Sequence, residues 1–216
     1  MLIVGIAGGT GAGKSTVVRK IMERLPKDRV ALMPQDNYYR DRSDLPLSER
    51  QKLNFDHPSA LEFELLVHHL EQLRNGNSIE MPIYSYLTCT RSIETVPITP
   101  KDVVVVEGIL ILGHLPLRQM LDIKVFVDAD ADDRLIRCIQ RDILERGRNV
   151  REVLERYERT VKPMHSQFIE PSKQYADIIV PQGGSNHVAI KVLASMIKSH
   201  LKENIHPIEG VPSSRH

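Results

Sequence analysis

Residues Gly8–Ser15 (GGTGAGKS) have the types and spacing of a phosphate-binding loop. They match the pattern G-x-x-x-x-G-K-[ST] in full, after a strand-like apolar run and before a segment of helical period. Glycines allow successive backbone N–H groups and the helix N-terminus to face an anion. Lys14 is expected to reach the β- and γ-phosphates of a nucleoside triphosphate, and the Ser15 hydroxyl to ligate Mg²⁺. The residues expected to contact this donor are Gly8, Gly9, Thr10, Gly11, Ala12, Gly13, Lys14, Ser15 and Thr16.

Two acidic residues follow predicted strands. Glu107 comes directly after the apolar run Val103–Val106, where phosphate-loop folds hold the outer shell of the metal or a water, so it joins Ser15 in the expected metal site. Asp36 comes just after the second strand. Ligands of an open α/β sheet bind outside the carboxyl ends of its strands, so Asp36 should face the same crevice as the loop. A carboxylate there can orient an acceptor hydroxyl and take its proton.

Arginines are concentrated between Asp132 and Asn149, at positions 134, 137, 141, 146 and 148. A helix places several of them on one stripe. Such a stripe is ordinarily a solvated face. Beside a phosphate loop, however, arginines on a mobile helix clamp the charge that develops on a transferred phosphoryl group, and this role is expected of Arg141 and Arg146.

Short apolar runs alternate with longer segments of helical period, which predicts an α/β fold. Near-continuous Val and Ile runs indicate strands that are covered on both faces. The predicted strands are 2–6, 29–33, 103–106, 123–127 and 177–180, and the predicted helices are 14–25, 60–73, 132–145, 150–168 and 187–203. The expected fold is a P-loop NTPase with a doubly wound parallel sheet of about five strands, a small antiparallel β insertion and a helical lid.

One kinase domain is expected over residues 1–205. Within it, residues 76–100 have two β-like stretches and no helical period, and are interpreted as a small antiparallel β insertion. Residues 131–149 form the expected arginine-rich lid. The tail 206–216 is rich in Pro, Gly and Ser and is expected to be flexible.

Composition excludes several classes of function. The formal net charge is +1, from 29 Lys and Arg against 28 Asp and Glu, which argues against nucleic-acid or membrane binding. The two cysteines have neither metal nor redox spacing, which predicts a reducing, cytoplasmic location. The guanine-reading motif of GTPases and the LSGGQ signature of transporter ATPases do not occur in the sequence.

The sequence resembles the uridine/cytidine kinase family from residue 1 to about residue 205. The resemblance is carried in order by GGTGAGKS, PQDNYYR, NFDHPSA, PIYSYLTCTR, VVVEGIL, KVFVDADADDRL, RDILERGR and VKPMHSQFIEPSKQYADIIVP. The pair NFDHP and RDxxERGR is specific to that family among phosphate-loop kinases. Resemblance to phosphoribulokinases and pantothenate kinases is looser.

The resemblance implies transfer of the γ-phosphoryl group of ATP or GTP, with Mg²⁺, to the 5′-hydroxyl of uridine or cytidine. By that resemblance Asp36 is the general base, and Asp56 binds the 2′- and 3′-hydroxyls, which suits a carboxylate that can accept from both. Arg141 and Arg146 lie at the phosphates. The resemblance also implies a homotetramer and feedback by pyrimidine triphosphates. The remaining positions that match acceptor-binding residues of the family are Tyr39, Phe55, Tyr84, Tyr86 and Arg148.

Four positions depart from the family pattern. Cys89 stands where the family has His, Cys138 where it has Arg, and Arg156 where it has Gln, all at positions around the base. Gln182 replaces an Arg in the loop near the adenine of the donor. These changes leave a sister kinase for another nucleoside, such as a purine, as the alternative acceptor specificity. A pyrimidine pocket repacked by Tyr84 or Gln140 explains the same changes. A kinase for a non-nucleoside alcohol is a weaker rival, because it should lack Asp56.

Overall fold

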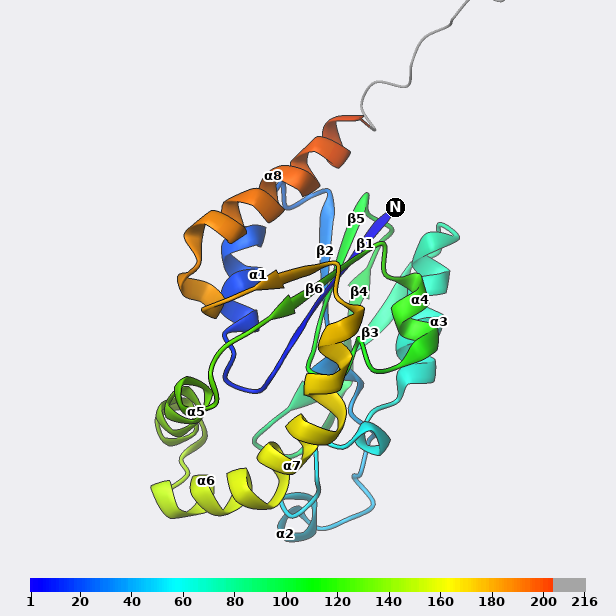
Figure 1. The fold of residues 1–216 in the computed structure, drawn as a ribbon. Coiled ribbons are helices and arrows are strands. Elements are labelled where there is room, and N and C mark those ends of the chain that lie inside the picture. The colour runs from blue at the N-terminus through cyan, green and yellow to red at the C-terminus, as the bar shows by residue number, and fades with distance from the viewer. Residues whose placement is uncertain (204–216) are drawn as a thin grey trace, which may run out of the picture.

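The computed structural model describes residues 1–203 of the chain. Its centre is a parallel sheet of five strands in the order β2-β5-β1-β6-β7 (Figure 1). The strands of this sheet are β1 (Leu2–Gly8), β2 (Val30–Pro34), β5 (Val103–Glu107), β6 (Ile123–Val127) and β7 (Ile178–Val180). The five predicted strands are confirmed to within two residues at each end. The tail 206–216 lies outside the described residues.

Helices cover both faces of the sheet. One face packs on α1 (Lys14–Met22) and α8 (His187–Glu203), and the other on α3 (Phe63–Arg74) and α4 (Leu115–Met120) (Figure 1). The four valines of β5 are fully buried, as expected for a central strand with helices above and below. The predicted doubly wound fold is therefore confirmed.

The register of the sheet brings three sequence-predicted sites together. Glu107 at the end of β5 lies opposite Ile6 of β1 and opposite Pro34 of β2. Because these strands are parallel, the phosphate loop after β1 and the segment 35–38 after β2 leave the sheet at the same edge as Glu107. The expectation that these sites share one crevice follows directly from this register.

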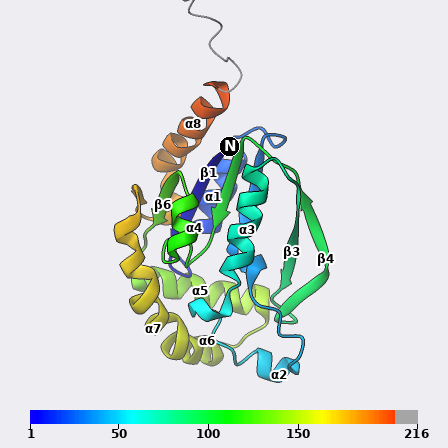
Figure 2. The same ribbon diagram turned by 90° about the vertical axis from the view of Figure 1, so that its right-hand side faces the viewer.

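The predicted β insertion is an antiparallel hairpin of β3 (Ile79–Ser85) and β4 (Thr90–Ile98). It lies beside α3 (Figure 2). Its tip points toward the carboxyl ends of the parallel strands, next to the 3₁₀ turn Gln35–Tyr38 and the short helix α2 (Leu47–Arg50).

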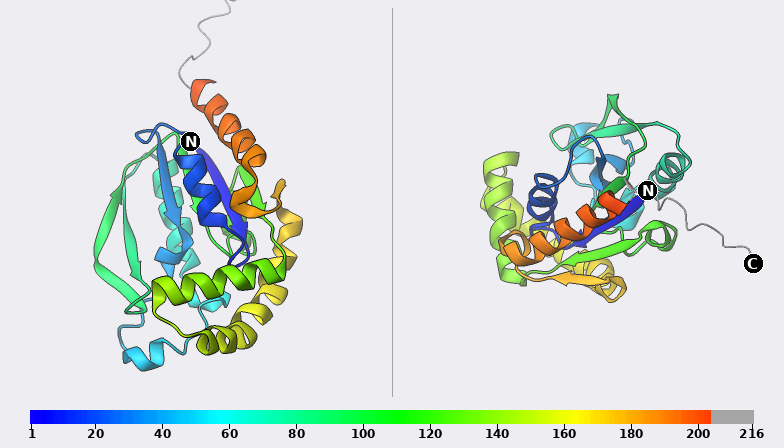
Figure 3. Two further views of the ribbon diagram at one scale, coloured as in Figure 1. Left: turned by 90° about the vertical axis from the view of Figure 1, so that its left-hand side faces the viewer. Right: turned by 90° about the horizontal axis from the view of Figure 1, so that it is seen from above.

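The arginine-rich segment is α5 (Ala131–Arg146), which runs across the carboxyl ends of the parallel strands (Figure 3). It ends at Gly147, whose φ of 64° is the left-handed conformation that favours glycine. The chain then turns into α6 (Val150–Arg156), whose start is fixed by a capping box in which Asn149 and Glu152 bond each other's backbone N–H. The sequence Gly147–Glu152 thus builds the bend between the two helices.

The predicted helices differ from the observed ones in four details. The helix predicted over 14–25 ends at Met22. The helix predicted over 60–73 begins at Phe63, because Pro58–Ala60 is a 3₁₀ turn and Leu61 forms a β-bridge with Tyr39. The helices α2 and α4 were not predicted from the sequence. The segment predicted as one helix, 150–168, is α6 and α7 (Lys162–Met164) joined by a π-helical stretch at 157–161 and followed by another at 165–169. Pro163 lacks the N–H that an α-helix needs there, which accounts for the irregular bonding.

After the second π-helical stretch, the chain passes through a 3₁₀ segment, Glu170–Tyr175, into β7, and through a 3₁₀ turn, Gly183–Ser185, into α8. None of the helices in residues 1–203 combines the length and the apolar character that crossing a bilayer requires.

Gly183 should be sensitive to substitution, because its φ is 58° and a Cβ there would lie 2.1 Å from the carbonyl oxygen of Ala12 in the phosphate loop. Gly183→Ala is expected to lower the free energy of unfolding by about 1–3 kcal/mol more than backbone strain alone, as overpacking does. Gly76→Ala is the matched control, since Gly76 also has a positive φ, 84°, but has no atom within 4 Å of the added methyl. It should show the strain alone, about 1–2 kcal/mol. Equal losses in urea denaturation would contradict the close packing of this loop on the phosphate loop.

Candidate active site

The phosphate loop, Gly8–Ser15, connects β1 to the first turn of α1. Gly11 has a φ of 81°, and a Cβ at this position would lie 2.3 Å from the carbonyl oxygen of Arg134, so α5 packs directly against the loop. Arg137 adds contacts from the same helix, donating from Nη1 to the carbonyl oxygens of Gly11 and Ala12 at 3.4 and 3.5 Å. The first two turns of α5 are therefore fastened to the phosphate loop.

Lys14 is buried, and its Nζ donates to the carbonyl oxygen of Gly9 at 3.2 Å. Burial lowers the pKa of Lys14 below its ordinary value, while the carboxylates of Glu107 and Asp36 act in the opposite direction. The Lys14 ammonium group thus lies near the carboxylates of Glu107 and Asp36, at the edge of the sheet where the donor phosphates are expected to bind.

Ser15 and Glu107, the two expected metal ligands, are in contact. The Ser15 hydroxyl donates to Oε1 of Glu107 at 3.0 Å. Burial raises the pKa of Glu107, while the charge of Lys14 and the bond from Ser15 lower it. A hydroxyl and a carboxylate are hard oxygen ligands, and Mg²⁺ takes one or two such groups together with substrate phosphates and waters. The donor set fits Mg²⁺. In residues 1–203 no cluster of three His, Cys, Asp or Glu forms an alternative metal site.

Asp36 lies in the 3₁₀ turn after β2 and accepts a hydrogen bond from the hydroxyl of Tyr86 in the hairpin. Burial raises the pKa of Tyr86 well above its ordinary value, and the Asp36 carboxylate raises it further. The guanidinium of Arg146 lies 4.6 Å from the centre of the Tyr86 ring, a cation–π contact. Asp36 is thus joined through Tyr86 both to the hairpin and to α5.

Asp56 is buried, with 3% of its surface exposed. The Thr10 hydroxyl of the phosphate loop donates to Oδ1 at 3.2 Å, and Nη2 of Arg156 donates to Oδ2 at 3.1 Å. The side chain of Asn54 accepts the Asp56 backbone N–H at 3.2 Å. The carboxylate predicted to hold the sugar therefore lies between the phosphate loop and α6.

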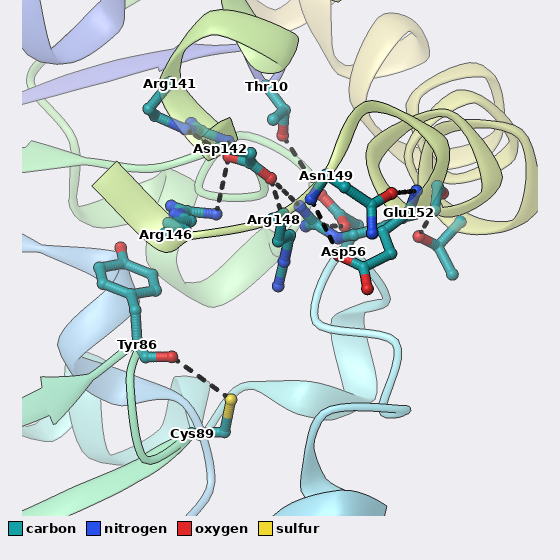
Figure 4. Close-up of polar contacts among 12 residues, drawn as sticks. Thr10, Asp56, Tyr86, Cys89, Arg141, Asp142, Arg146, Arg148, Asn149 and Glu152 are labelled. Carbon is teal, nitrogen blue, oxygen red and sulfur yellow. Dashed lines mark hydrogen bonds and ion pairs between the residues drawn. The ribbon is translucent and has the colours of Figure 1, made fainter. Parts of the chain in front are cut away.

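Asp142 is the centre of the arginine cluster (Figure 4). Its side chain is only 1% exposed, and four guanidinium groups surround it within 3.4 Å. Burial alone would raise the pKa of Asp142, but the arginines, Arg141 first, bring it below its ordinary value. The four arginines are Arg141, Arg146, Arg148 and Arg156.

Three aromatic rings form a wall beside these carboxylates. The ring of Tyr39 lies 5.3 Å from that of Phe55 and 5.0 Å from that of Tyr84, measured between centroids. Tyr84 also contacts Tyr86 edge-on at 5.5 Å. The pKa of Tyr39 is raised well above its ordinary value, by burial first and then by the Asp36 and Asp56 carboxylates. An aromatic wall next to carboxylates, which can accept hydrogen bonds from hydroxyls, suits a flat ring attached to a sugar.

The four positions that depart from the family pattern lie in four different segments of the fold. Cys89 is in the tip of the hairpin with a φ of 50°, and its thiol contacts the carbonyl oxygen of Tyr86 at 3.5 Å. Cys138 is buried in α5, and burial raises the pKa of its thiol. The guanidinium of Arg156 bridges Asp56 and Asp142. Gln182 is exposed, in the left-handed region with a φ of 63°, and precedes the glycines that pack on the phosphate loop beside Thr16.

Sequence reasoning missed Asp142, the counter-charge of the arginines. An acid four residues before Arg146, in a helix otherwise rich in arginine, was the available signal. It also missed His165, which lies against Gly9 beside Arg134, one of the predicted lid arginines; both side chains would come within 3.0 Å of a Cβ at Gly9. Arg134 is buried, and its Nε donates to the carbonyl oxygen of Ala129 at 3.2 Å. Nε2 of His165 lies 3.2 Å from Oε2 of Glu170. No spacing in the sequence pointed to the Gly9 contact.

Comparison with known proteins shows to which family the chain belongs. A profile of the family described as Phosphoribulokinase / Uridine kinase matches residues 3–189. A protein of Clostridium novyi (strain NT) named uridine kinase is 53% identical over 203 residues, which are 94% of this chain and 98% of that protein. A protein of Bacillus subtilis (strain 168) with the same name is 50% identical over 203 residues, 94% of this chain and 96% of that protein.

Solved structures share the fold at low sequence identity. D-glycerate 3-kinase from Cryptococcus neoformans superposes with a TM-score of 0.63 at 20% identity, over 84% of this chain and 86% of that one. Phosphoribulokinase from Rhodobacter spheroides has a TM-score of 0.63 at 16% identity, over 83% and 69% of the two chains. At these identities, the similarities show a shared fold and nothing more.

Asp142→Asn should destabilise the protein, because the change leaves four arginines close together without their shared counter-charge. Removing one partner of a buried ion pair costs about 3–5 kcal/mol, and the partly exposed arginines favour the lower end. Urea denaturation at pH 7 measures the loss. Asp133→Asn is the matched control in the same helix, since Asp133 is 57% exposed and pairs only with Arg137 at 3.5 Å. It should change the free energy of unfolding by less than about 1 kcal/mol.

The same pair of proteins should differ in pH dependence. A carboxyl group with a lowered pKa in the folded state stabilises the fold above its unfolded pKa, about 3.9 for Asp, and loses that contribution as the pH falls through the folded value. The difference in stability between wild type and Asp142→Asn should therefore be full above about pH 5 and shrink below about pH 4. A difference that stays constant down to pH 3 would mean that the charge of Asp142 does not stabilise the cluster.

Proposed function

The chain belongs to the phosphoribulokinase/uridine kinase family, and from this premise we propose that it is a nucleoside kinase that phosphorylates the 5′-hydroxyl of uridine or cytidine, giving UMP or CMP. The supporting observation is the hydrogen bond between the Thr10 hydroxyl and Asp56. It places a carboxylate suited to sugar hydroxyls directly beside the loop that binds the phosphate donor.

In the proposed reaction the phosphate loop holds the nucleoside triphosphate by its backbone N–H groups and by Lys14. Asp56 accepts hydrogen bonds from the 2′- and 3′-hydroxyls and so positions the 5′-hydroxyl. The 5′-oxygen forms a bond to the γ-phosphorus, and the bond from that phosphorus to the β,γ-bridging oxygen breaks. The electron pair leaves with the nucleoside diphosphate, and the hydroxyl proton passes to Asp36.

The arginines that surround Asp142 supply positive charge near the transferred phosphoryl group, Arg141 and Arg146 first. Arg148 is assigned to the nucleoside side. Mg²⁺, held through Ser15 and Glu107, would neutralise phosphate oxygens of the donor. ATP or GTP is the proposed donor, with Gln182 at its base.

The acceptor base is proposed to be a pyrimidine that packs against the rings of Tyr39, Phe55, Tyr84 and Tyr86, with Cys89 and Cys138 at the edge of the pocket. The alternative purine specificity rests on Cys89, Cys138 and Arg156 together, with Arg156 supplying the donors for a larger base. Both Nη atoms of Arg156 are engaged by Asp56 and Asp142, which favours the pyrimidine reading. The relatives named uridine kinase, about half of whose residues are identical to this chain, point the same way.

The proposal includes a cytoplasmic location and a homotetramer, as the family resemblance implies, and no nucleic-acid or membrane partner. The near balance of 29 basic and 28 acidic residues supports this last part.

A panel of uridine, cytidine, adenosine, guanosine and inosine, each assayed with ATP or GTP for nucleoside monophosphate formation, tests the proposal. Uridine and cytidine should be the preferred acceptors. Lys14→Ala should lower kcat by about 10²–10³-fold or more, because it removes a preorganised charge at the phosphates. Circular dichroism of the variant checks that the fold is kept. Formation of no nucleoside monophosphate from any member of the panel would refute the proposed function, and a preference for purines would shift it to the alternative.

Asp36→Asn should lower kcat far more than it weakens nucleoside binding. The amide can still bond the hydroxyls of Tyr86 and of the acceptor but cannot take a proton, and general bases contribute about 10²–10⁴-fold. Steady-state kinetics and calorimetric nucleoside binding measure the two effects separately. If KM rose while kcat stayed unchanged, Asp36 would be a binding residue and the base would lie elsewhere.

A further inference from the structure

A continuous chain of polar contacts joins the phosphate loop to the arginine cluster. It runs from Thr10 to Asp56, from Asp56 to Arg156, and from Arg156 to Asp142. Figure 4 labels Thr10, Asp56 and Asp142 of this chain of contacts. Each of the three links is between 3.1 and 3.3 Å long. Three of the four residues come from segments far apart in the sequence, so only the fold brings them into line.

The Thr10 hydroxyl is not needed to hold phosphate, because a phosphate loop uses its backbone N–H groups, its lysine and its final hydroxyl for that purpose. Here the side chain of Thr10 points to Asp56 instead. The bond joins two residues 46 positions apart and crosses from the donor site to the acceptor site. If the donor orders the phosphate loop, the bond from Thr10 therefore also restricts the orientation of the Asp56 carboxylate.

Arg156 makes the second half of the connection. Its Nη2 donates to Asp56 and its Nη1 to Asp142, so one planar guanidinium spans the two buried carboxylates. Its side chain is 24% exposed, and the Thr160 hydroxyl bonds its backbone carbonyl at 2.9 Å. Because Asp142 also holds Arg141, Arg146 and Arg148, the orientation of Asp56 is tied to the groups that would contact the transferred phosphoryl.

The lone pairs of Asp56 are sufficient in number to accept a vicinal diol. A carboxylate has about four acceptor positions, two on each oxygen. Thr10 uses one on Oδ1 and Arg156 uses one on Oδ2. One position on each oxygen remains, which is what two adjacent hydroxyls require. Because Asp56 is 3% exposed, a diol reaches it only after neighbouring side chains move, and the two existing bonds, which use other lone pairs, then hold the carboxylate in the orientation that the diol needs.

We propose that Thr10 and Arg156 are positioning residues that orient Asp56 for the vicinal diol of the acceptor and thereby make donor and acceptor binding mutually reinforcing. The inference rests on the proposed function for the identity of the two ligands. A triphosphate that orders the phosphate loop orders Thr10, and Thr10 orders Asp56. By linkage, a diol on Asp56 must tighten triphosphate binding by the same factor.

The test is the dissociation constant of a non-hydrolysable ATP analogue with Mg²⁺, measured by calorimetry with and without saturating uridine, or with the nucleoside that the panel identifies. In the wild type the nucleoside should tighten analogue binding by about 5-fold or more, the lower end of typical coupling. Thr10→Val, which keeps the shape and removes the hydroxyl, and Arg156→Gln should each reduce the factor to less than about 2. Thr10→Ser keeps a hydroxyl and should retain the coupling.

Two controls separate positioning from general damage. Thr95→Val is the matched surface change, since Thr95 bonds only Glu80 within the exposed part of the hairpin, and it should leave the coupling unchanged. On the wild-type protein, the 2′,3′-dideoxy form of the same nucleoside should bind without tightening the analogue, because it lacks both hydroxyls that Asp56 accepts. This ligand control needs no variant and gives an answer even if Thr10→Val fails to fold.

The inference is wrong if the wild type shows no coupling, if Thr10→Val and Arg156→Gln keep the wild-type factor, or if the dideoxynucleoside couples as strongly as the ribonucleoside. These outcomes would leave the kinase activity in place and remove only the connection through Asp56. Failure of every nucleoside to bind or react would instead overturn the proposed function, and this inference with it.

Discussion

Four arginines gather around the buried carboxylate of Asp142, and the geometry of the active site depends on this interaction. Guanidinium groups so close together repel one another, and without a shared counter-charge α5 and α6 would not hold them at the same place. The bend built by Gly147 and the capping box of Asn149 brings α6 back against α5, so Arg156 reaches the same carboxylate as Arg141. One acid thus organises positive charge above the ends of the parallel strands.

The parallel sheet and the two excursions from it, the hairpin β3–β4 and the helix pair α5–α6, contribute different residues to the site. The parallel strands β1, β2 and β5 deliver the phosphate loop, Asp36 and Glu107 to one edge through their register. The hairpin β3–β4 adds the tyrosines, and α5–α6 adds the arginines. Tyr86 joins the two excursions, because its hydroxyl bonds Asp36 and its ring lies under Arg146. The parallel core therefore carries the residues proposed to bind the donor, together with Asp36, and the hairpin and α5–α6 carry residues proposed to contact the acceptor and the transferred phosphoryl group.

Arg156 illustrates how a substituted residue acquires a role from its surroundings. Read as an isolated change near a base pocket, it offers five donors to any ring carbonyl or nitrogen. In the folded protein two carboxylates lie within 3.3 Å of it, and charge-assisted bonds to them are stronger than bonds to a neutral base. Asp56 accepts hydrogen bonds from both Arg156 and Thr10, and this shared carboxylate connects the proposed base pocket with the phosphate loop.

The sequence alone determined the features that depend on neighbours along the chain. The phosphate loop is eight consecutive residues, and the buried strands are continuous Val and Ile runs. The hairpin and the arginine-rich helix are predicted from the hydrophobic period and the composition of their own segments. Boundaries shifted at the 3₁₀ turn Pro58–Ala60, which delays the start of α3, and at Pro163, whose missing N–H redirects the backbone bonds. Tertiary structure alone decided the pairings of side chains: Thr10 with Asp56, Tyr86 with Asp36, and Arg156 with Asp142. These residues are 14 to 50 positions apart, and which charged or polar groups meet depends on burial, which removes water as a competing partner and is a property of the fold.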